Sequence, residues 1–360
     1  MERFTIPIGP LHPLLKEPLS LLLDVSGERI TGAAVRIGYV HRGIERLCQT
    51  KTYIQNLHLF ERVCGICSHV HSTAYCQAVE ALLEVTIPRR AAYIRSLLCE
   101  LERIHSHLLW LGVLAEAIGF TTIFMYAWSD RELVLDVMEL LTGGRVSHAA
   151  NVIGGVRTDL DAARAKQVAA TLDRLERQMQ PFEALIERDR SWRRRTHGIG
   201  ILTKDVVHAY GVVGPTARAS GCTFDVRRDD PYAAYPELEA RVIGAVDGDV
   251  WARAHVRVRE IGESLRLCRQ VLEGLPEGRV AERVPRRVPE GEVVTRCEAP
   301  RGELFYYLRS DGSDRPARIK VRTPTLPMLL ALRHLLPGIQ TADVAAVLAG
   351  ADLCISCADR

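Results

Sequence analysis

The chain has 360 residues, of which 47% are hydrophobic and 25% are charged, so it is long enough to bury a large core. Its 47 lysines and arginines against 44 aspartates and glutamates give a formal net charge of +3. The basic clusters lack interleaved aromatic residues, which argues against a nucleic-acid-binding protein. Ten cysteines, with no secretory signal pattern at the start, indicate thiols or metal ligands rather than disulfides.

The first 47 residues are predicted to form strands and turns. Their β-branched runs are interrupted by the turn-forming stretch SGE and by Gly32, which favours a hairpin. From about Lys51 the pattern changes, because apolar residues recur at steps of three and four. This spacing is clearest over residues 91–120 and predicts a long helix there.

The longest apolar stretch, Leu108–Trp128, is long enough to span a bilayer. Glu116 and Gly119 interrupt it, so a helix buried in a protein core is the preferred interpretation. A following helix is predicted to start at a capping Asp130 and to end at the glycine pair 143–144.

The second half alternates between helical and strand patterns. Residues 159–189 form a strongly amphipathic helical pattern, predicted to break near Pro181, and 249–273 form another. A Gly- and Pro-rich region (198–235) lies between them, and residues 291–324 are predicted to be strands around the turn SDGSD. The tail is helical again before its cysteines.

These patterns predict a mainly α fold with small β pieces, an α+β class with a helical-bundle core. We expect one continuous domain over 1–360. It would comprise an N-terminal β-hairpin region (1–50), a helical core (51–290), and a β-turn region with the C-terminal cysteine pair (291–360).

Two C-x-x-C pairs carry the chemistry: Cys64 with Cys67, and Cys354 with Cys357. Each pair can place two sulfurs on one side of a turn, close enough to chelate one ion. Zinc in a Cys₄ tetrahedron is one possibility, but local zinc modules keep their pairs roughly 15–20 residues apart. Spacing alone therefore leaves zinc, another transition metal, two separate redox motifs, or coincidence open.

The residues around the pairs are more specific. RVCGICSHVH (62–71) fits R-x-C-G-x-C-x-x-x-H, and the tail fits D-x-C-x-x-C. Together they resemble the large subunit of nickel–iron hydrogenases. The stretches GPLHPLLKEP, GYVHRGIE, RIHSHLLWLG, NVIGGVR and EAPRG are similar to the membrane-bound, energy-converting branch, which also resembles the quinone-site subunit of respiratory complex I. The resemblance covers nearly the whole chain and implies that fold.

The resemblance implies a nickel–iron centre with carbon monoxide and cyanide on the iron, made by maturation proteins. Cys64, Cys67, Cys354 and Cys357 would hold nickel, and Cys67 and Cys357 would also bridge to iron. Soft thiolates suit such a metal. His71 would hydrogen-bond a bridging sulfur.

Further roles follow position by position from the resemblance. Arg301 in EAPRG would lie beside the iron ligands and cover the open side of the site. Asp352 would cover the same side together with Arg301. Glu17 would transfer protons from a nickel-bound cysteine toward the solvent. His12 matches the histidine that meets quinone in the complex I homologue, and is expected here to be structural or part of the proton path.

Two positions depart from the family pattern. Leu353 stands where the family usually has proline, which leaves an additional N–H and more backbone freedom. Glu45 matches the glutamate that binds a structural metal ion, Mg²⁺ or iron, near the C-terminus. Arg360 occupies the place of the usual histidine ligand, and arginine cannot ligate a metal.

The function implied is the catalytic large subunit of an energy-converting hydrogenase, interconverting dihydrogen with protons and electrons, linked to ferredoxin and coupled to ion translocation. No cysteine set remains for an iron–sulfur cluster, so electrons would come through a small subunit with a four-iron four-sulfur cluster. Membrane antiporter-like subunits and a ferredoxin-linked electron-transfer subunit would complete a complex on the cytoplasmic side of the cell membrane, to which this chain binds peripherally. The alternatives are a quinone-reducing complex I-type subunit without nickel and a zinc-binding assembly scaffold.

Overall fold

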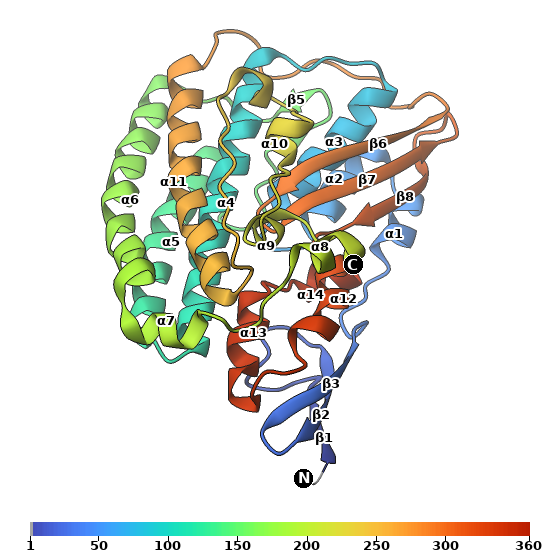
Figure 1. Ribbon diagram of the computed structural model, residues 1–360. Helices are drawn as coiled ribbons and strands as arrows, with labels where there is room; N and C mark the ends of the chain where they lie inside the picture. The colour runs from blue at the N-terminus through green and yellow to red at the C-terminus, as the bar shows by residue number, and fades with distance from the viewer. Residues whose placement is uncertain (1–2) are drawn as a thin grey trace.

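The computed structural model describes residues 3–360 and is mainly helical (Figure 1). Long helices form a bundle on one side, a three-stranded sheet with two helices lies on the other, and a second small sheet extends below them. The C-terminus lies in the interior of this arrangement and the N-terminus at its lower tip. The predicted mainly α class with small β pieces is confirmed.

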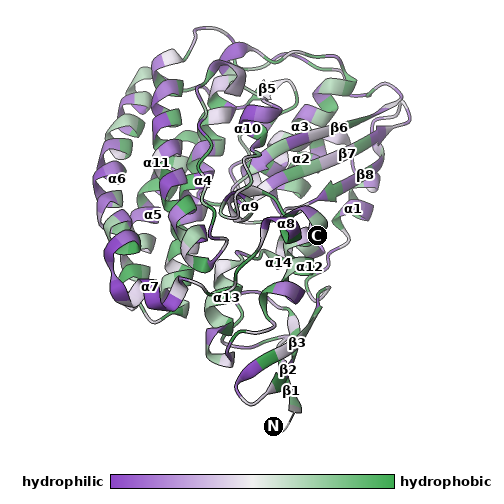
Figure 2. Ribbon diagram, in the orientation of Figure 1, coloured by the Kyte–Doolittle hydropathy of each residue, from purple (hydrophilic) through white to green (hydrophobic). Residues whose placement is uncertain are grey.

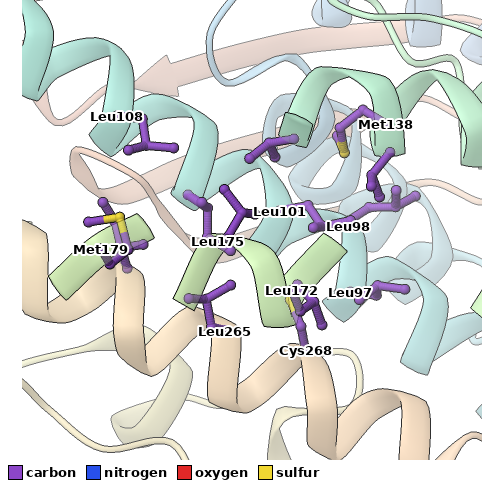
Figure 3. Close-up of a cluster of buried hydrophobic side chains, with 14 of the residues drawn as sticks. Leu97, Leu98, Leu101, Leu108, Met138, Leu172, Leu175, Met179, Leu265 and Cys268 are labelled. Atoms are coloured by element: carbon purple, nitrogen blue, oxygen red, sulfur yellow. The ribbon is translucent and has the colours of Figure 1, made fainter. Parts of the chain in front are cut away.

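The bundle consists of four long helices: α4 (Arg89–Ala117), α5 (Thr121–Thr142), α6 (Ala162–Arg188) and α11 (Val250–Gly274). Their apolar faces meet in one large core, in which leucines of α4 pack against leucines and methionines of α5, α6 and α11 (Figure 3). Helix α4 contacts α5 and α11 within the bundle and shorter elements outside it, so it is buried on every face over most of its length.

Helix α6 shows how the pattern of the sequence determines orientation. Its buried residues recur at steps of three and four, from Val168 to Ile186, while the outer face is polar (Figure 2). The predicted break near Pro181 is wrong, because α6 runs through it. Met179 and Phe182 are buried on either side, and this packing offsets the backbone hydrogen bond that proline cannot donate.

The apolar stretch Leu108–Trp128 is not the single buried helix that we expected. Gly119, with φ of 89°, turns the chain between α4 and α5, and Phe120 packs edge-on against Trp192. The second half of the stretch is partly exposed, with Met125 63% accessible. Among residues 3–360, no helix is long and apolar enough to cross a membrane.

The predicted start of the next helix at Asp130 is also wrong. Asp130 lies inside α5 and is buried, because the helix already begins at Thr121. Its predicted end is correct, since Gly143 closes the helix with φ of 84°.

Both three-stranded sheets are antiparallel with neighbouring strands in chain order. The N-terminal sheet pairs β1 (Arg3–Ile8), β2 (Ser20–Ser26) and β3 (Arg29–Arg36), which confirms the predicted strands and hairpin. The larger sheet pairs β6 (Gly291–Ala299), β7 (Gly302–Ser310) and β8 (Pro316–Arg322). It packs against α3 (Ser68–Leu82), so β6 lies beside the helix that follows the first cysteine pair.

The remaining elements are short and connect these layers. They are α1 (Ile44–Leu47), α2 (Tyr53–Glu61), α3 (Ser68–Leu82), the strand pair β4 (Asn151–Val152) and β5 (Gly155–Val156), α7 (Arg190–Thr196), α8 (Lys204–Tyr210), α9 (Gly214–Arg218), α10 (Val226–Asp229), α12 (Thr325–Leu335), α13 (Val344–Gly350) and α14 (Ile355–Asp359), with 3₁₀ turns at Cys48–Thr50, Tyr235–Glu237 and Thr341–Asp343.

The bundle core predicts a clear difference between a buried and an exposed leucine. Leu172 is buried between α6 and α11, so Leu172→Ala should lower the free energy of unfolding by about 2–5 kcal/mol. Leu330→Ala on α12 is the matched control, because Leu330 is half exposed, and it should cost no more than about 0.5 kcal/mol. Denaturant titration of the purified variants measures both; equal losses would contradict the packing described.

Candidate metal centre

The two cysteine pairs meet in the interior. Cys64 and Cys67 lie in the turn between α2 and α3, while Cys354 precedes α14 and Cys357 lies within it. The sulfur atoms of Cys64 and Cys354 are 3.5 Å apart and those of Cys67 and Cys357 are 3.6 Å apart. All four side chains are buried. Residues 290 positions apart in sequence therefore form one compact cluster of sulfur atoms.

The charge state of these thiols explains why a cation suits the cluster. Hydrogen bonding with the other three thiols lowers the pKa of Cys64, and the Arg301 guanidinium adds to the effect. The pKa of Cys354 is instead raised by its neighbours Cys357 and Cys64 and by burial. Four thiolates cannot coexist here without a counter-charge, whereas a soft transition metal binds all four. The donor set fits such a metal.

His71, predicted to touch a bridging sulfur, lies on α3 next to Cys357. Its Nε2 is 3.7 Å from the Cys357 sulfur, and its Nδ1 is 2.7 Å from the Tyr306 hydroxyl. Burial lowers the pKa of His71 to about 4, so the ring is neutral. If Tyr306 donates to Nδ1, the remaining ring proton is on Nε2 and points at the sulfur.

Arg301 and Asp352 form a buried ion pair over the cluster. The Arg301 Nε is 2.9 Å from Asp352 Oδ1 and also donates to the Asp352 carbonyl oxygen at 3.0 Å. Asp352 adopts a left-handed conformation with φ of 52°, which suits this double contact. Burial opposes the charge of Arg301, but Asp352 and the nearby thiols raise its pKa well above the usual value. The Arg301 Nη1 is buried without a partner among the described residues.

A second arginine, Arg257, also contacts the Asp352 carboxylate. Arg257 of α11 reaches Asp352 Oδ2 at 3.4 Å, and its guanidinium stacks 4.4 Å from the ring centre of Trp110. Asp352 is thus held by two cations, which fixes the direction in which Arg301 presents its free nitrogen.

Helix α4 positions the parts of the site that lie on loops. His105 contacts the carbonyl oxygen of Ile66, between the two cysteines of the first pair, at 3.0 Å. Glu102 accepts the first N–H groups of α3, from His69 at 2.7 Å and Val70 at 3.0 Å. Arg103 donates to the carbonyl oxygens at the end of β6, just before Arg301. One buried helix therefore fixes both the first cysteine loop and the arginine.

Glu17 lies against the second cysteine pair. Its carboxylate accepts the backbone N–H of Ile355 and the Ser356 hydroxyl, the latter at 2.7 Å, and both residues stand between Cys354 and Cys357. The nearby His12 instead accepts the N–H of Leu14 at 3.1 Å, a local turn contact.

A cavity of about 340 Å³ reaches from the surface to this site. Its walls are mostly apolar, from the segment 14–19, α4 and the tail, including Leu353. Lys16, Glu17, Arg301 and Asp352 supply its charged groups. The cavity therefore leads a small uncharged molecule to Ile66 and Ile355, which are chain neighbours of the cysteine loops, along mostly apolar walls.

Glu45 does not join this cluster. Its carboxylate binds Arg360 at 2.9 Å, Lys320 at 2.8 Å and the backbone N–H of Val321 at 3.1 Å. Among residues 3–360, the only groups of three or more potential metal ligands lying close together are drawn from the four cysteines and His71. The residues around Glu45 therefore do not fit a divalent metal ion.

Sequence reasoning missed several supporting residues. Tyr306 could have been found, since the alternation of LFYYLRS in β7 points it to the same side as buried leucines. Arg257 and Glu102 carried no such signal, because a charged residue in a helical pattern is normally assigned to the solvent face.

Comparisons with known proteins identify the family of this chain. The family described as "Respiratory-chain NADH dehydrogenase, 49 Kd subunit" matches residues 117–287 and 282–360, and "Nickel-dependent hydrogenase" matches 42–132. The chain is 40% identical over 361 residues to the carbon monoxide-induced hydrogenase of Rhodospirillum rubrum, covering 100% of both chains. It is also 37% identical over 372 residues to the alpha subunit of the membrane-bound hydrogenase of Pyrococcus furiosus, covering 99% of this chain and 87% of that protein.

Comparison of the fold with solved structures leads to the same family. A solved structure of the membrane-bound sulfane sulfur reductase, an archaeal respiratory membrane complex, matches with a TM-score of 0.95 and 32% identity, covering 99% of this chain and 98% of the other. The chain belongs to the family that joins the large subunits of membrane-bound hydrogenases with the 49 kDa subunit of respiratory NADH dehydrogenase. It is thus an oxidoreductase-type subunit whose relatives work in membrane-bound complexes.

The cluster predicts which cysteines matter. Replacing Cys64, Cys67, Cys354 or Cys357 singly with serine should strongly lower the content of bound transition metal, because each change removes a soft ligand from a site with none to spare. Cys76→Ser is the matched control, since Cys76 is equally buried in the core but outside the cluster. Metal analysis of the purified variants measures this, and full metal content in any of the four would refute the assignment.

Proposed function

We propose that this chain is the catalytic large subunit of an energy-converting nickel–iron hydrogenase, which interconverts dihydrogen with protons and electrons. The observation that carries the proposal is the meeting of four buried cysteine sulfurs beneath the Arg301–Asp352 pair. Its relatives include a carbon monoxide-induced hydrogenase that covers the full length of both chains.

The four cysteines would hold nickel, with Cys67 and Cys357 shared with an iron carrying carbon monoxide and cyanide. When bound, such a centre supplies the redox chemistry of dihydrogen cleavage. The protein supplies the surroundings: His71 orients toward the Cys357 sulfur, and the Arg301 Nη1, which lacks a partner among the described residues, offers a donor to an anionic metal ligand. A buried cation stabilises negative charge that develops during cleavage.

Glu17 is the residue that we assign to proton transfer. Its carboxylate touches the backbone between the second pair of cysteines and also lines the cavity. A general base must be close to the group that it deprotonates and must exchange protons with water. Glu17 meets both conditions better than Glu45, which is paired with Lys320 and Arg360 away from the cluster.

The remaining assignments concern the complex. Electrons would arrive from a small subunit with a four-iron four-sulfur cluster, linked to ferredoxin. The chain would bind antiporter-like membrane subunits peripherally, on the cytoplasmic side, and turnover would be coupled to ion translocation. The support for these partners is the membrane-bound complexes to which the relatives belong.

A quinone-type reductase is the second candidate, and the cavity favours it. A volume of about 340 Å³ with apolar walls is far larger than dihydrogen needs, and falls in the lower range of small-molecule pockets. Quinone chemistry has no use for four clustered thiols, however, and for this reason we rank the hydrogenase first.

The proposal predicts a specific effect at Arg301. Arg301→Lys keeps the charge but loses the planar fork that binds Asp352 twice. Dihydrogen evolution by the purified complex, driven by a reduced viologen, should fall by roughly 10²–10³-fold while nickel and iron stay bound. Arg322→Lys is the control and should keep normal activity, because Arg322 of β8 is paired with Glu303 of β7 and not with Asp352. Loss of metal from Arg301→Lys would show that the role is structural.

A second prediction concerns Glu17. Glu17→Gln preserves size but cannot carry a proton, so hydrogen–deuterium exchange catalysed with dihydrogen should collapse while the metal content and the infrared bands of the iron ligands stay nearly unchanged. Ser356→Ala is the control, because it removes the hydrogen bond between Ser356 and Glu17 but leaves the carboxylate in place. Near-normal exchange in Glu17→Gln would assign proton transfer to another group.

A further inference from the structure

Residues 38–45 and 356–360 form a set of contacts that we call the tail clasp. The Asp359 carboxylate accepts the backbone N–H groups of Gly38 at 2.8 Å and Val40 at 3.1 Å, and His41 contacts the Asp359 carbonyl oxygen. At the end of the clasp, Arg360 binds Glu45. The C-terminal residues are thus held by the segment that follows β3.

Arg42 ties the clasp to the first cysteine loop. Its guanidinium donates to the carbonyl oxygens of Arg62 at 2.7 Å, Val63 at 2.8 Å and Ser356 at 3.0 Å. Val63 directly precedes Cys64, and Ser356 directly precedes Cys357. One side chain therefore bridges the two backbone segments that carry the two cysteine pairs.

The electrostatics at Glu45 are opposite to those of a metal site. Both carboxylate oxygens already accept hydrogen bonds from positive groups, Arg360 and Lys320, and from a backbone N–H. A guanidinium has no lone pair to offer an ion, and a divalent cation here would meet two positive charges. The Glu45 and Arg360 side chains are only 15% and 17% accessible, so solvent screens their attraction weakly.

We infer that the Arg360 guanidinium replaces a structural metal ion in this chain: it binds Glu45 and so attaches the cysteine-bearing tail without any divalent cation. Arg360 and Glu45 are positioning residues, which act on the site through the backbone of the tail. The inference does not depend on which metal the four cysteines bind.

Hydrogen–deuterium exchange of the tail peptide in the purified full chain tests this. Arg360→Gln and Glu45→Gln should each speed exchange over residues 354–360 by about ten- to hundredfold, since each breaks a charge-assisted contact. Arg360→Lys, which keeps the charge, should restore most of the protection. Lys320→Gln is the control, because Lys320 is half exposed and holds only Glu45 rather than the tail.

Unchanged exchange in the bundle helices α4 and α11 of the same samples shows that the variants are folded. EDTA or added Mg²⁺ should leave tail exchange in the unaltered protein as it was. Faster tail exchange on adding EDTA would overturn the inference, as would full protection in both glutamine variants.

Discussion

The structure depends on bringing two segments that are distant in sequence together at four sulfur atoms. Closing so long a loop costs conformational entropy, although the cost grows only with the logarithm of length. Packing four thiols in a buried space adds an electrostatic penalty whenever more than one ionises. A bound cation relieves that penalty, while the protein contacts around the tail offset the entropy. The site therefore needs both a counter-charge for the thiols and contacts that hold the two cysteine segments together.

Helix α4 holds most of the site in place. It is buried on all sides and still carries charged residues. These groups bind backbone in the first cysteine loop and at the end of β6, so the two loops are held by one rigid element. Behind them lies a buried ion network in which Arg218 contacts Glu260 and Glu298, both at 2.8 Å. Such pairs are costly to desolvate, and removing one partner typically costs about 3–5 kcal/mol. Their benefit is a defined geometry for the strand that precedes Arg301.

Much of this could be predicted from the sequence, for reasons that differ between elements. Periodicity predicted α4, α6 and α11, and turn residues predicted the strands of β6–β8, since these signals are local. The start of α5 was mispredicted because aromatic packing at Phe120, a tertiary contact, begins the helix before Asp130. Pro181 was misjudged for the same reason: packing on both sides outweighs the local cost.

The site divides in a similar way. The cysteines, His71, Glu17, Arg301 and Asp352 lie in short motifs, so the resemblance could predict them as site residues, and the structure brings them close together. Their supporting partners could not be identified so readily. Arg257 and Glu102 matter only through contacts with distant residues, and in a helical pattern they look like surface charges. The interpretation of Glu45 depended on Arg360, whose ion pair only the folded chain reveals.

X-ray absorption at the nickel edge, on the complex purified with this chain, tests the central claim most directly. Nickel should be surrounded by sulfur from the four cysteines, because the sulfur of Cys64 lies 3.5 Å from that of Cys354 and the sulfur of Cys67 lies 3.6 Å from that of Cys357. An iron neighbour is expected as well. Zinc in a purely sulfur tetrahedron, or no metal at the cysteines, would contradict the claim.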